Sequence, residues 1–135
     1  SWDIPAAKSG WIPIEKPVIM AILDKLDEKT IIEIAQMVGK KITEETTLTM
    51  TGDFDVSELV SVMELRSKAA GFQFDKFRDA NIIKFVIGHQ TGRKYSIFLQ
   101  SFYENGFKQL GCPVEFKITE NIMVCQIPTR HLDGD

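Results

Sequence analysis

The chain has 135 residues, 44% of them hydrophobic and 26% charged, which is ordinary for one soluble globular domain. A formal net charge of −3 and a pI near 5.4 exclude the overall basic character that nucleic-acid-binding domains show. The apolar runs are too short to span a bilayer, and Cys112 and Cys125 form neither a metal-ligand spacing nor a disulfide framework. We therefore expect reduced thiols in a cytoplasmic protein without a membrane segment.

The first part of the chain predicts an extended lead-in over residues 1–14, where prolines and glycine discourage regular structure. A helix is expected from Pro17, whose missing N–H is harmless in a first turn. Asp27 is a suitable N-cap for a second helix, which we expect to end at Gly39. The apolar face of this second helix would consist of Ile31, Ile34, Ala35 and Val38.

The segment 40–52 is ambiguous from its sequence. Threonines alternate there with Leu48 and Met50, which favours a strand, although the same residues could form a poor helix. Gly52 and Asp53 would then interrupt the chain.

A third helix is predicted after Asp55, because Asp55-Val56-Ser57-Glu58 has the spacing of a capping box. We expect Gly71 to end it. Its apolar face would comprise Val56, Leu59, Val60 and Met63.

Two β-hairpins can be aligned from their hydrophobic patterns. In the first, a turn at Asp79-Ala80 would give the pairs Phe72 with Ile87, Phe74 with Phe85 and Asp75 with Lys84. In the second, a turn at Glu120-Asn121 would give the pairs Val114 with Ile127, Phe116 with Cys125 and Ile118 with Met123. A slip of one residue would move either apolar set to the opposite face.

A helix from Gly92 to Leu110 is expected between the hairpins, with Thr91 as its cap and Gly111 as its stop. Gly106 would mark either a close approach or a kink. The buried stripe of this helix would comprise Tyr95, Phe98, Leu99, Phe102 and Leu110.

The order of elements predicts an α+β fold, in which helices cover one face of a mostly antiparallel four-stranded sheet. We expect a single α+β domain over residues 15–128, after the lead-in at 1–14 and before a polar tail at 129–135. Within this domain, 15–52 would be a helical subregion and 53–128 the sheet-containing core.

A candidate anion-binding site follows the second strand of the first hairpin. His89, Thr91, Gly92, Arg93 and Lys94 gather at an expected helix N-terminus, where unpaired N–H groups and the helix dipole favour negative charge. The spacing of the glycines differs from that of a phosphate-binding P-loop, which excludes an NTPase. Protonation of His89 below about pH 6.5 would strengthen the site. The alternatives are an ordinary solvated helix start and a partly buried structural histidine.

No catalytic set, metal-ligand set or cofactor-binding motif is recognisable in the sequence. A small enzyme that uses His89 as its acid–base group remains an alternative. The spacing from Ala35 to Gly39 also suggests a helix-turn-helix, and hence a DNA-binding module at 17–50. Glu44 and Glu45 stand where a recognition helix would contact phosphates, so nucleic-acid binding by this segment alone is not expected.

Three short motifs are similar to those of an uncharacterised archaeal family over about residues 10–127. They are Gly10-Trp11-Ile12-Pro13 with Lys16, Ser67 to Gly71-Phe72, and His89-x-x-Gly92-x-Lys94-x-Ser96. Members of that family resemble ribbon-helix-helix regulators with this domain appended. The resemblance implies a helical segment 40–52 and no known activity. Tyr95 stands where the family pattern has tryptophan.

The leading functional hypothesis is a non-enzymatic sensing or dimerisation domain of an archaeal regulatory protein. We expect a small anionic ligand and a homo-oligomer, with no cofactor. Any DNA-binding segment would lie outside these 135 residues.

Overall fold

The structure is a computed structural model that describes residues 12–51 and 54–132. The predicted lead-in and the break at Gly52-Asp53 therefore lie mostly outside the described residues, and Ile12 to Glu15 have no regular structure. The helices are α2 (Lys16–Asp24), α3 (Glu28–Thr51), α4 (Val56–Ala69) and α5 (Arg93–Gln109), with a 3-10 turn η1 (Thr129–His131). The strands are β1 (Gln73–Arg78), β2 (Ile82–Gly88), β3 (Glu115–Ile118) and β4 (Ile122–Pro128).

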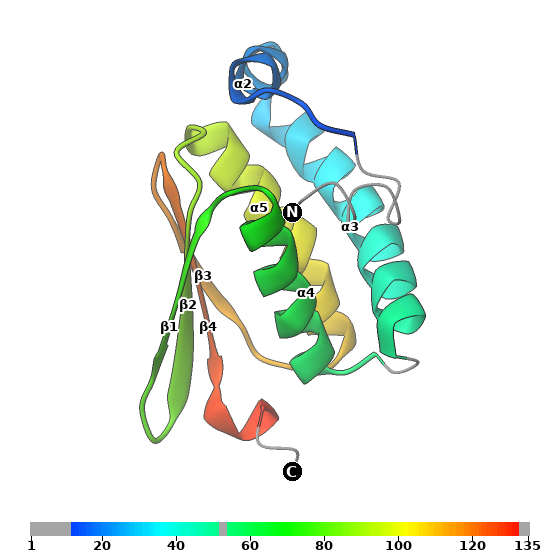
Figure 1. Ribbon diagram of the computed structural model, residues 1–135, viewed down its shortest axis with the longest axis vertical. Coiled ribbons are helices and arrows are strands. Elements are labelled where there is room, and N and C mark those ends of the chain that lie inside the picture. Colours follow the sequence, from blue (N-terminus) through cyan, green and yellow to red (C-terminus); the bar gives the residue numbers. More distant parts are fainter. Residues whose placement is uncertain (1–11, 52–53, 133–135) are drawn as a thin grey trace.

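The predicted α+β fold is confirmed. The four strands form one antiparallel sheet in the order β1-β2-β4-β3, so the two hairpins meet along β2 and β4. Helices α4 and α5 lie on one face of the sheet, and α3 lies farther from it, packed along α5 and against α4 (Figure 1). The main core is enclosed between the sheet and α5, and its largest fully buried side chains include Phe85, Phe107 and Met123.

Helix α3 is a single helix of 24 residues, so the predicted stop at Gly39 and the strand-like interpretation of 40–52 are both wrong. Asp27 caps its start as expected, because the Thr30 N–H donates to the Asp27 carboxylate at 2.8 Å. Gly39 is buried where α3 crosses α5, and a Cβ atom there would overlap the backbone carbonyl oxygen of Phe102. This glycine therefore allows two helices to touch and does not end a helix. Because α3 continues without a turn at Gly39, the predicted helix-turn-helix is excluded.

Helix α4 has the ends that its sequence predicts. Asp55 accepts a hydrogen bond of 2.8 Å from the Glu58 N–H, which satisfies one of the free donors of the first turn. Gly71 follows the C-terminus with a φ of +77°, a conformation that glycine adopts without strain. The four residues that we expected on the apolar face are all buried.

The two hairpins differ in how well their registers were predicted. The register of β3 and β4 is confirmed, with Phe116 opposite Cys125 and Ile118 opposite Met123. The register of β1 and β2 is wrong by two residues, because Phe74 lies opposite Ile87 instead of Phe85. The Asp79 carboxylate accepts from the N–H groups of Asn81 and Ile82, so the turn is centred one residue later than predicted. A two-residue shift leaves every side chain on its predicted face.

Helix α5 starts after Gly92, whose φ is +95°, and not after a Thr91 cap. Of its expected buried stripe, Leu99 and Phe102 are buried, whereas Tyr95, Phe98 and Leu110 are only partly buried. Residues outside that stripe are buried instead, namely Ile97, Tyr103 and Phe107. Gly106 marks a close approach, because a Cβ atom there would lie 3.0 Å from Leu59 Cδ2 of α4. Beyond β4, the expected polar tail begins as η1, with Thr129 buried. No helix in the described ranges is long and apolar enough to cross a bilayer.

Candidate functional site

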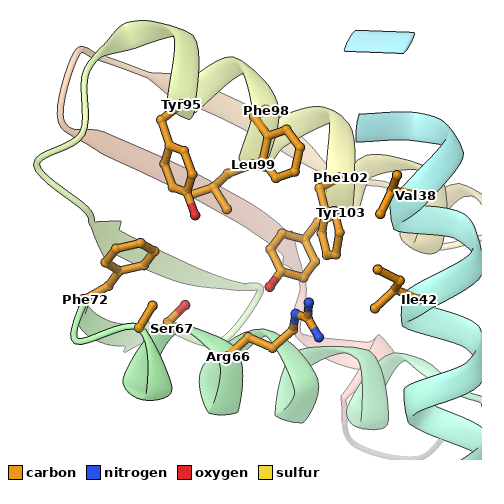
Figure 2. A pocket seen from close by; sticks show the side chains of 11 residues that line it. Val38, Ile42, Arg66, Ser67, Phe72, Tyr95, Phe98, Leu99, Phe102 and Tyr103 are labelled. Carbon is orange, nitrogen blue, oxygen red and sulfur yellow. The ribbon is translucent and has the colours of Figure 1, made fainter. Parts of the chain in front are cut away.

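A cavity of about 260 Å³ lies between α3, α4 and α5 (Figure 2). Helix α5 supplies one wall, α4 the wall opposite it, and α3 closes one end. Its described lining consists of Val38 and Ile42 from α3, Arg66, Ser67 and Ala70 from α4 and its C-cap, Phe72, and Tyr95, Phe98, Leu99, Phe102 and Tyr103 from α5.

The wall from α5 is a continuous row of aromatic rings. Tyr95, Phe98 and Phe102 follow one another at helical spacing, which places them on one side of the helix. Their ring centroids are 5.8 Å apart for Tyr95 and Phe98 and 5.7 Å apart for Phe98 and Phe102. Phe72 extends the row, with its centroid 5.7 Å from that of Tyr95. These rings give the cavity a predominantly apolar surface.

A few polar groups interrupt this apolar lining. The Arg66 guanidinium carbon lies 5.4 Å from the centroid of the Phe102 ring, a cation–π distance. The hydroxyl groups of Tyr95 and Tyr103 point toward α4 (Figure 2). Burial raises the pKa of Tyr95 to about 12, and it raises the pKa of Tyr103 as well, while the charge of Arg66 opposes both shifts. Both groups are therefore neutral phenols that can donate hydrogen bonds at neutral pH.

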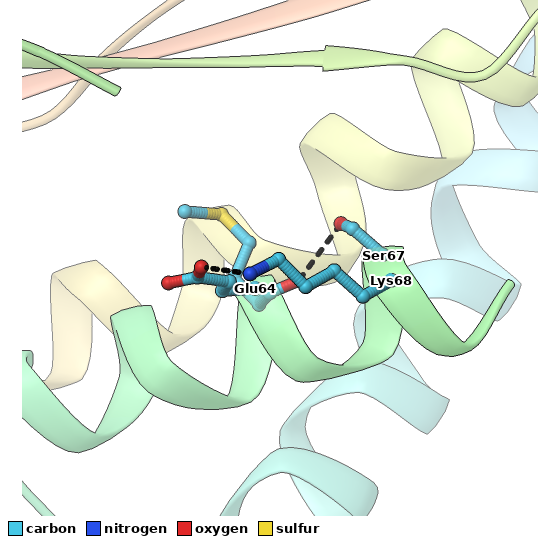
Figure 3. A network of polar contacts seen from close by, with 4 residues as sticks. Glu64, Ser67 and Lys68 are labelled. Atoms are coloured by element: carbon cyan, nitrogen blue, oxygen red, sulfur yellow. Dashed lines mark hydrogen bonds and ion pairs between the residues drawn. The ribbon is translucent and has the colours of Figure 1, made fainter. Parts of the chain in front are cut away.

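The other charged residues of this part of α4 do not line the cavity. Lys68 and Glu64 form an exposed ion pair of 2.7 Å (Figure 3). Ser67 faces the cavity, but its hydroxyl already donates to the Met63 carbonyl oxygen at 2.8 Å. Ser67 can therefore offer only its lone pairs to a ligand.

His89, the centre of the predicted anion site, is 1% exposed and belongs to a buried hydrogen-bond chain. Its Nδ1 accepts from the Thr91 N–H at 2.9 Å, which leaves the proton on Nε2. Nε2 then donates to Ser96 Oγ at 2.6 Å, and Ser96 Oγ donates to the Thr119 carbonyl oxygen at 2.7 Å. These hydrogen bonds join the end of β2, the start of α5 and the turn between β3 and β4.

The expectation that His89 becomes protonated below about pH 6.5 is wrong. Burial, and secondarily the charge of Lys16, lower its pKa to about 4, so the ring is neutral at physiological pH. Lys16 lies nearby because its Nζ donates to the His89 carbonyl oxygen at 3.0 Å. Both ring nitrogens are engaged inside the protein, which gives His89 the structural role that was one of the alternatives.

Lys94 also makes internal bonds. Its Nζ donates to the carbonyl oxygens of Asp24 and Leu26, at 3.2 and 2.7 Å, and so fastens the end of α2 to the start of α5. Arg93 is exposed beside it, and Thr91 is buried with its hydroxyl donating to the His89 carbonyl oxygen. The five residues are thus neighbours, but three of them hold the fold together. The anion site stays a prediction that depends mainly on Gly92 and Arg93.

The two cysteines are buried, and no metal-ligand group occurs in the described part of the chain. Cys112 and Cys125 are free and buried, and burial raises the pKa of both thiols, to about 11 for Cys112. Neither is a reactive thiolate at neutral pH. No group of His, Cys, Asp and Glu among the described residues is arranged to hold a metal ion.

Sequence reasoning missed the cavity because three helices that are far apart in the chain supply its walls. One signal for it was present. The apolar stripe of α4 runs through Leu59 and Met63, and the next position on that face is Arg66. A charged residue in line with a buried stripe indicates a polar group that faces inward.

Comparison with known proteins finds similarity in fold. No family model matches the sequence, and neither does any curated protein. A mutant of T. tengcongensis H-NOX matches with a TM-score of 0.57 at 14% identity, over 91% of this chain and 83% of that one. A Cs H-NOX mutant that carries the unnatural amino acid 4-cyano-L-phenylalanine matches with a TM-score of 0.57 at 15% identity, over 93% and 84%.

A third structure comes from work that probed haem distortion in the H-NOX family. It matches with a TM-score of 0.58 at 13% identity, over 93% of this chain and 82% of that one. Identities this low concern the backbone arrangement and not the residues of any site. The chain therefore has a fold similar to that of H-NOX domains.

Proposed function

We propose that this chain is a non-enzymatic sensing domain that binds a small, largely apolar molecule in the cavity between α3, α4 and α5. The observation that carries the proposal is the cavity itself, about 260 Å³ in volume and lined by a row of aromatic rings with a few polar groups. Ligand sites have this composition, in which apolar walls supply affinity and a few polar groups fix orientation. The similarity in fold to H-NOX domains, one structure of which concerns haem distortion, supports a ligand-sensing use of this fold.

Haem is the first ligand to consider, since one of the similar structures concerns haem distortion. A haem iron needs an axial His, Cys, Met or Tyr ligand. In the described lining, only Tyr95 and Tyr103 are of these types, and burial keeps both as neutral phenols. His89 is near, but both of its ring nitrogens are hydrogen-bonded within the protein. The residues do not fit a haem, and we propose a ligand that needs no axial coordination.

The domain would act within a regulatory protein. The resemblance of its motifs to an archaeal family, members of which resemble ribbon-helix-helix regulators with this domain appended, supports this part of the proposal. Ligand binding would then change the packing of α3 against α5, since both helices line the cavity. Homo-oligomerisation is a further expectation of the same proposal.

Native mass spectrometry of the freshly purified full chain, with a matched pair of variants, tests the proposal. Val38→Phe adds a ring to the wall of the cavity, whereas Met37→Phe adds one at the neighbouring position, which is 69% exposed. We expect a retained or added small apolar molecule on the wild type and on Met37→Phe, and a bare chain for Val38→Phe. 4-Phenylbutanol serves as the added probe.

Two results would contradict this function. One is that neither a retained molecule nor the probe stays on the wild-type chain. The other is that Val38→Phe holds the molecule as well as Met37→Phe does, which would place the binding site elsewhere on the protein.

A further inference from the structure

We infer that two copies of this chain associate through the outer side of α3, with the two α3 helices running antiparallel. The surface is the α3 seam, which we define as Ile34, Met37, Lys41, Glu44 and Leu48. The inference rests on the homo-oligomerisation that belongs to the proposed function, and it assigns a surface to it. It is independent of the ligand in the cavity.

The α3 seam exposes large apolar side chains to solvent. Met37 is 69% exposed, Leu48 55% and Ile34 37%. Between them, Lys41 is exposed and Glu44 is partly exposed. Helix α3 lies at the edge of the molecule away from the sheet, with α5 on its inner side (Figure 1). Single exposed apolar residues are common on monomers, whereas a row of them along one side of an outer helix indicates a protein–protein surface.

The spacing of the α3 seam is that of a helix that pairs with another helix. Its members are three, four, three and four residues apart, so they alternate between the a and d positions of a heptad and follow one line along α3. Gly39, which packs against the Phe102 carbonyl group of α5, falls at heptad position f, on the side opposite this line. The α3 seam is therefore separate from the side of α3 that is buried within the chain.

The α3 seam is complementary to itself when it is read in the opposite direction. In an antiparallel pair with its two-fold axis between positions 42 and 43, Met37 lies opposite Leu48 of the partner subunit. Lys41 then lies opposite Glu44 of the partner subunit. The two-fold axis repeats both pairs, so the dimer has two apolar layers flanking two layers of opposite charge. A second copy of the chain thus supplies both the apolar partners and the matching charges.

Other occupants match the α3 seam less well. In a parallel pair, Lys41 would face Lys41 of the partner subunit, and Glu44 would face Glu44 of the partner subunit, so that like charges repel in both layers. The phosphates of a nucleic acid would meet Glu44 and the exposed Glu45. A helix that lies on an anionic membrane is basic on its polar face, whereas this part of α3 carries charges of both signs.

Reversal of one charge tests the pairing on the full-length protein without added ligand. Lys41→Glu and Glu44→Lys each replace two attractions across the two-fold axis by two repulsions. In a concentration series followed by sedimentation velocity, we expect the wild type to be dimeric at micromolar concentrations. Each single variant should raise the dissociation constant by about tenfold or more. Lys29→Glu makes the same change of charge at an exposed position of α3 off the seam, and it should stay dimeric.

Two combinations then restore the opposite charges. The double variant Lys41→Glu with Glu44→Lys exchanges the two charges within one chain, so it should dimerise as the wild type does. A mixture of the two single variants, one of them isotope-labelled, should form a heterodimer in native mass spectrometry, because each copy carries the charge that the other lacks. Both recoveries also show that the single variants are folded, since an unfolded chain could not pair in this way.

The outcomes separate this inference from the ligand-binding function. A wild type that stays monomeric at all concentrations would overturn the dimer, while the cavity would still be judged by Val38→Phe. A dimer that both single reversals leave intact would place the interface elsewhere and overturn the assignment to α3. Failure of both the double variant and the mixture to dimerise would overturn the antiparallel pairing. Met37→Phe, the control for the cavity, keeps the seam apolar and should remain dimeric.

Discussion

Polar side chains around the start of α5 join secondary-structure elements to one another. Lys16 binds the carbonyl group of His89, and Lys94 binds the carbonyl groups of Asp24, at the end of α2, and of Leu26, just beyond it. Ser96 bridges His89 to the β3–β4 turn. The sequence indicated a polar cluster here correctly. It could not show that the partners are backbone carbonyl groups from 23 to 73 residues away, because no local pattern encodes such contacts.

The His89 ring makes the stability of the protein depend on pH. Its pKa in the folded state is about 4, below the ordinary value of 6.5, so the neutral ring contributes stability above pH 6.5 that is lost as the pH falls toward 4. The difference corresponds to about 3 kcal/mol. We expect the free energy of unfolding, measured with urea, to fall by an amount of this order between those pH values, beyond the contribution of the carboxylates.

His89→Asn isolates this contribution, because asparagine can still accept from the Thr91 N–H but does not titrate. It loses the bond to Ser96, so at pH 7 it should be less stable than the wild type by about 1–3 kcal/mol. The gap between the two proteins should narrow as the pH falls to 4. His131 is present in both and cancels. A gap that is constant with pH would show that His89 does not titrate as described.

At the scale of elements, the contact between α3 and α5 determines how the helical layer is built. Gly39 was predicted to end a helix because glycine is common just after helices. The same residue is also common where two backbones touch. Sequence alone does not separate the two uses, whereas the Phe102 carbonyl group beside Gly39 does.

Substitution of the two helical glycines by alanine tests this packing. Alanine is favoured over glycine inside a helix by about 1 kcal/mol, so a glycine without a packing role would give a stabilised variant. We expect Gly39→Ala to be destabilised by about 2 kcal/mol, because its methyl group meets rigid backbone. Gly106→Ala should be close to neutral, since its neighbour is the flexible end of the Leu59 side chain. Chemical unfolding measures both, and equal or reversed effects would contradict the helix crossing.

The attachment of α2 to α5 gives a second prediction for an element. Lys94→Met removes the two bonds to the carbonyl groups of Asp24 and Leu26, so α2 should open more easily by about 1 kcal/mol. Hydrogen exchange of α2 amides should accelerate several-fold. Arg93→Met, at the adjacent exposed position, is the control. Similar exchange in the two variants would mean that Lys94 does not hold α2.

The two hairpins show how far a register can be predicted. For β3 and β4, the turn and the pairs of Phe116 and Ile118 were identified correctly, because the faces alternate cleanly around Glu120-Asn121. For β1 and β2, the exposed end of β1 carries few apolar residues to align, and the Asp79 side chain selects the later turn. Each side chain of this hairpin was assigned to the correct face of the sheet but to the wrong cross-strand partner. A shift of the register by two residues changes the partner and keeps the face.

At the scale of the whole molecule, the sheet is predictable from the sequence and the cavity is not. Each strand and each helix of the core has an apolar period of its own. The cavity depends on the relative placement of α3, α4 and α5, which the long α3 fixes by crossing α5 at Gly39. Since α3 was expected to end at Gly39, and residues 40–52 were ambiguous between a strand and a helix, the second half of α3, with Ile42 in the cavity lining, was assigned to no site.

The most direct test of the central claim is an amide chemical-shift titration of the labelled full chain with 4-phenylbutanol. The account predicts saturable shifts that cluster at Val38, Arg66, Ser67 and Phe98, and that disappear in Val38→Phe but persist in Met37→Phe. The absence of saturable shifts would contradict the claim. So would a cluster of shifts at Gly92 and Arg93, which would place the binding site at the start of α5 and not in the cavity.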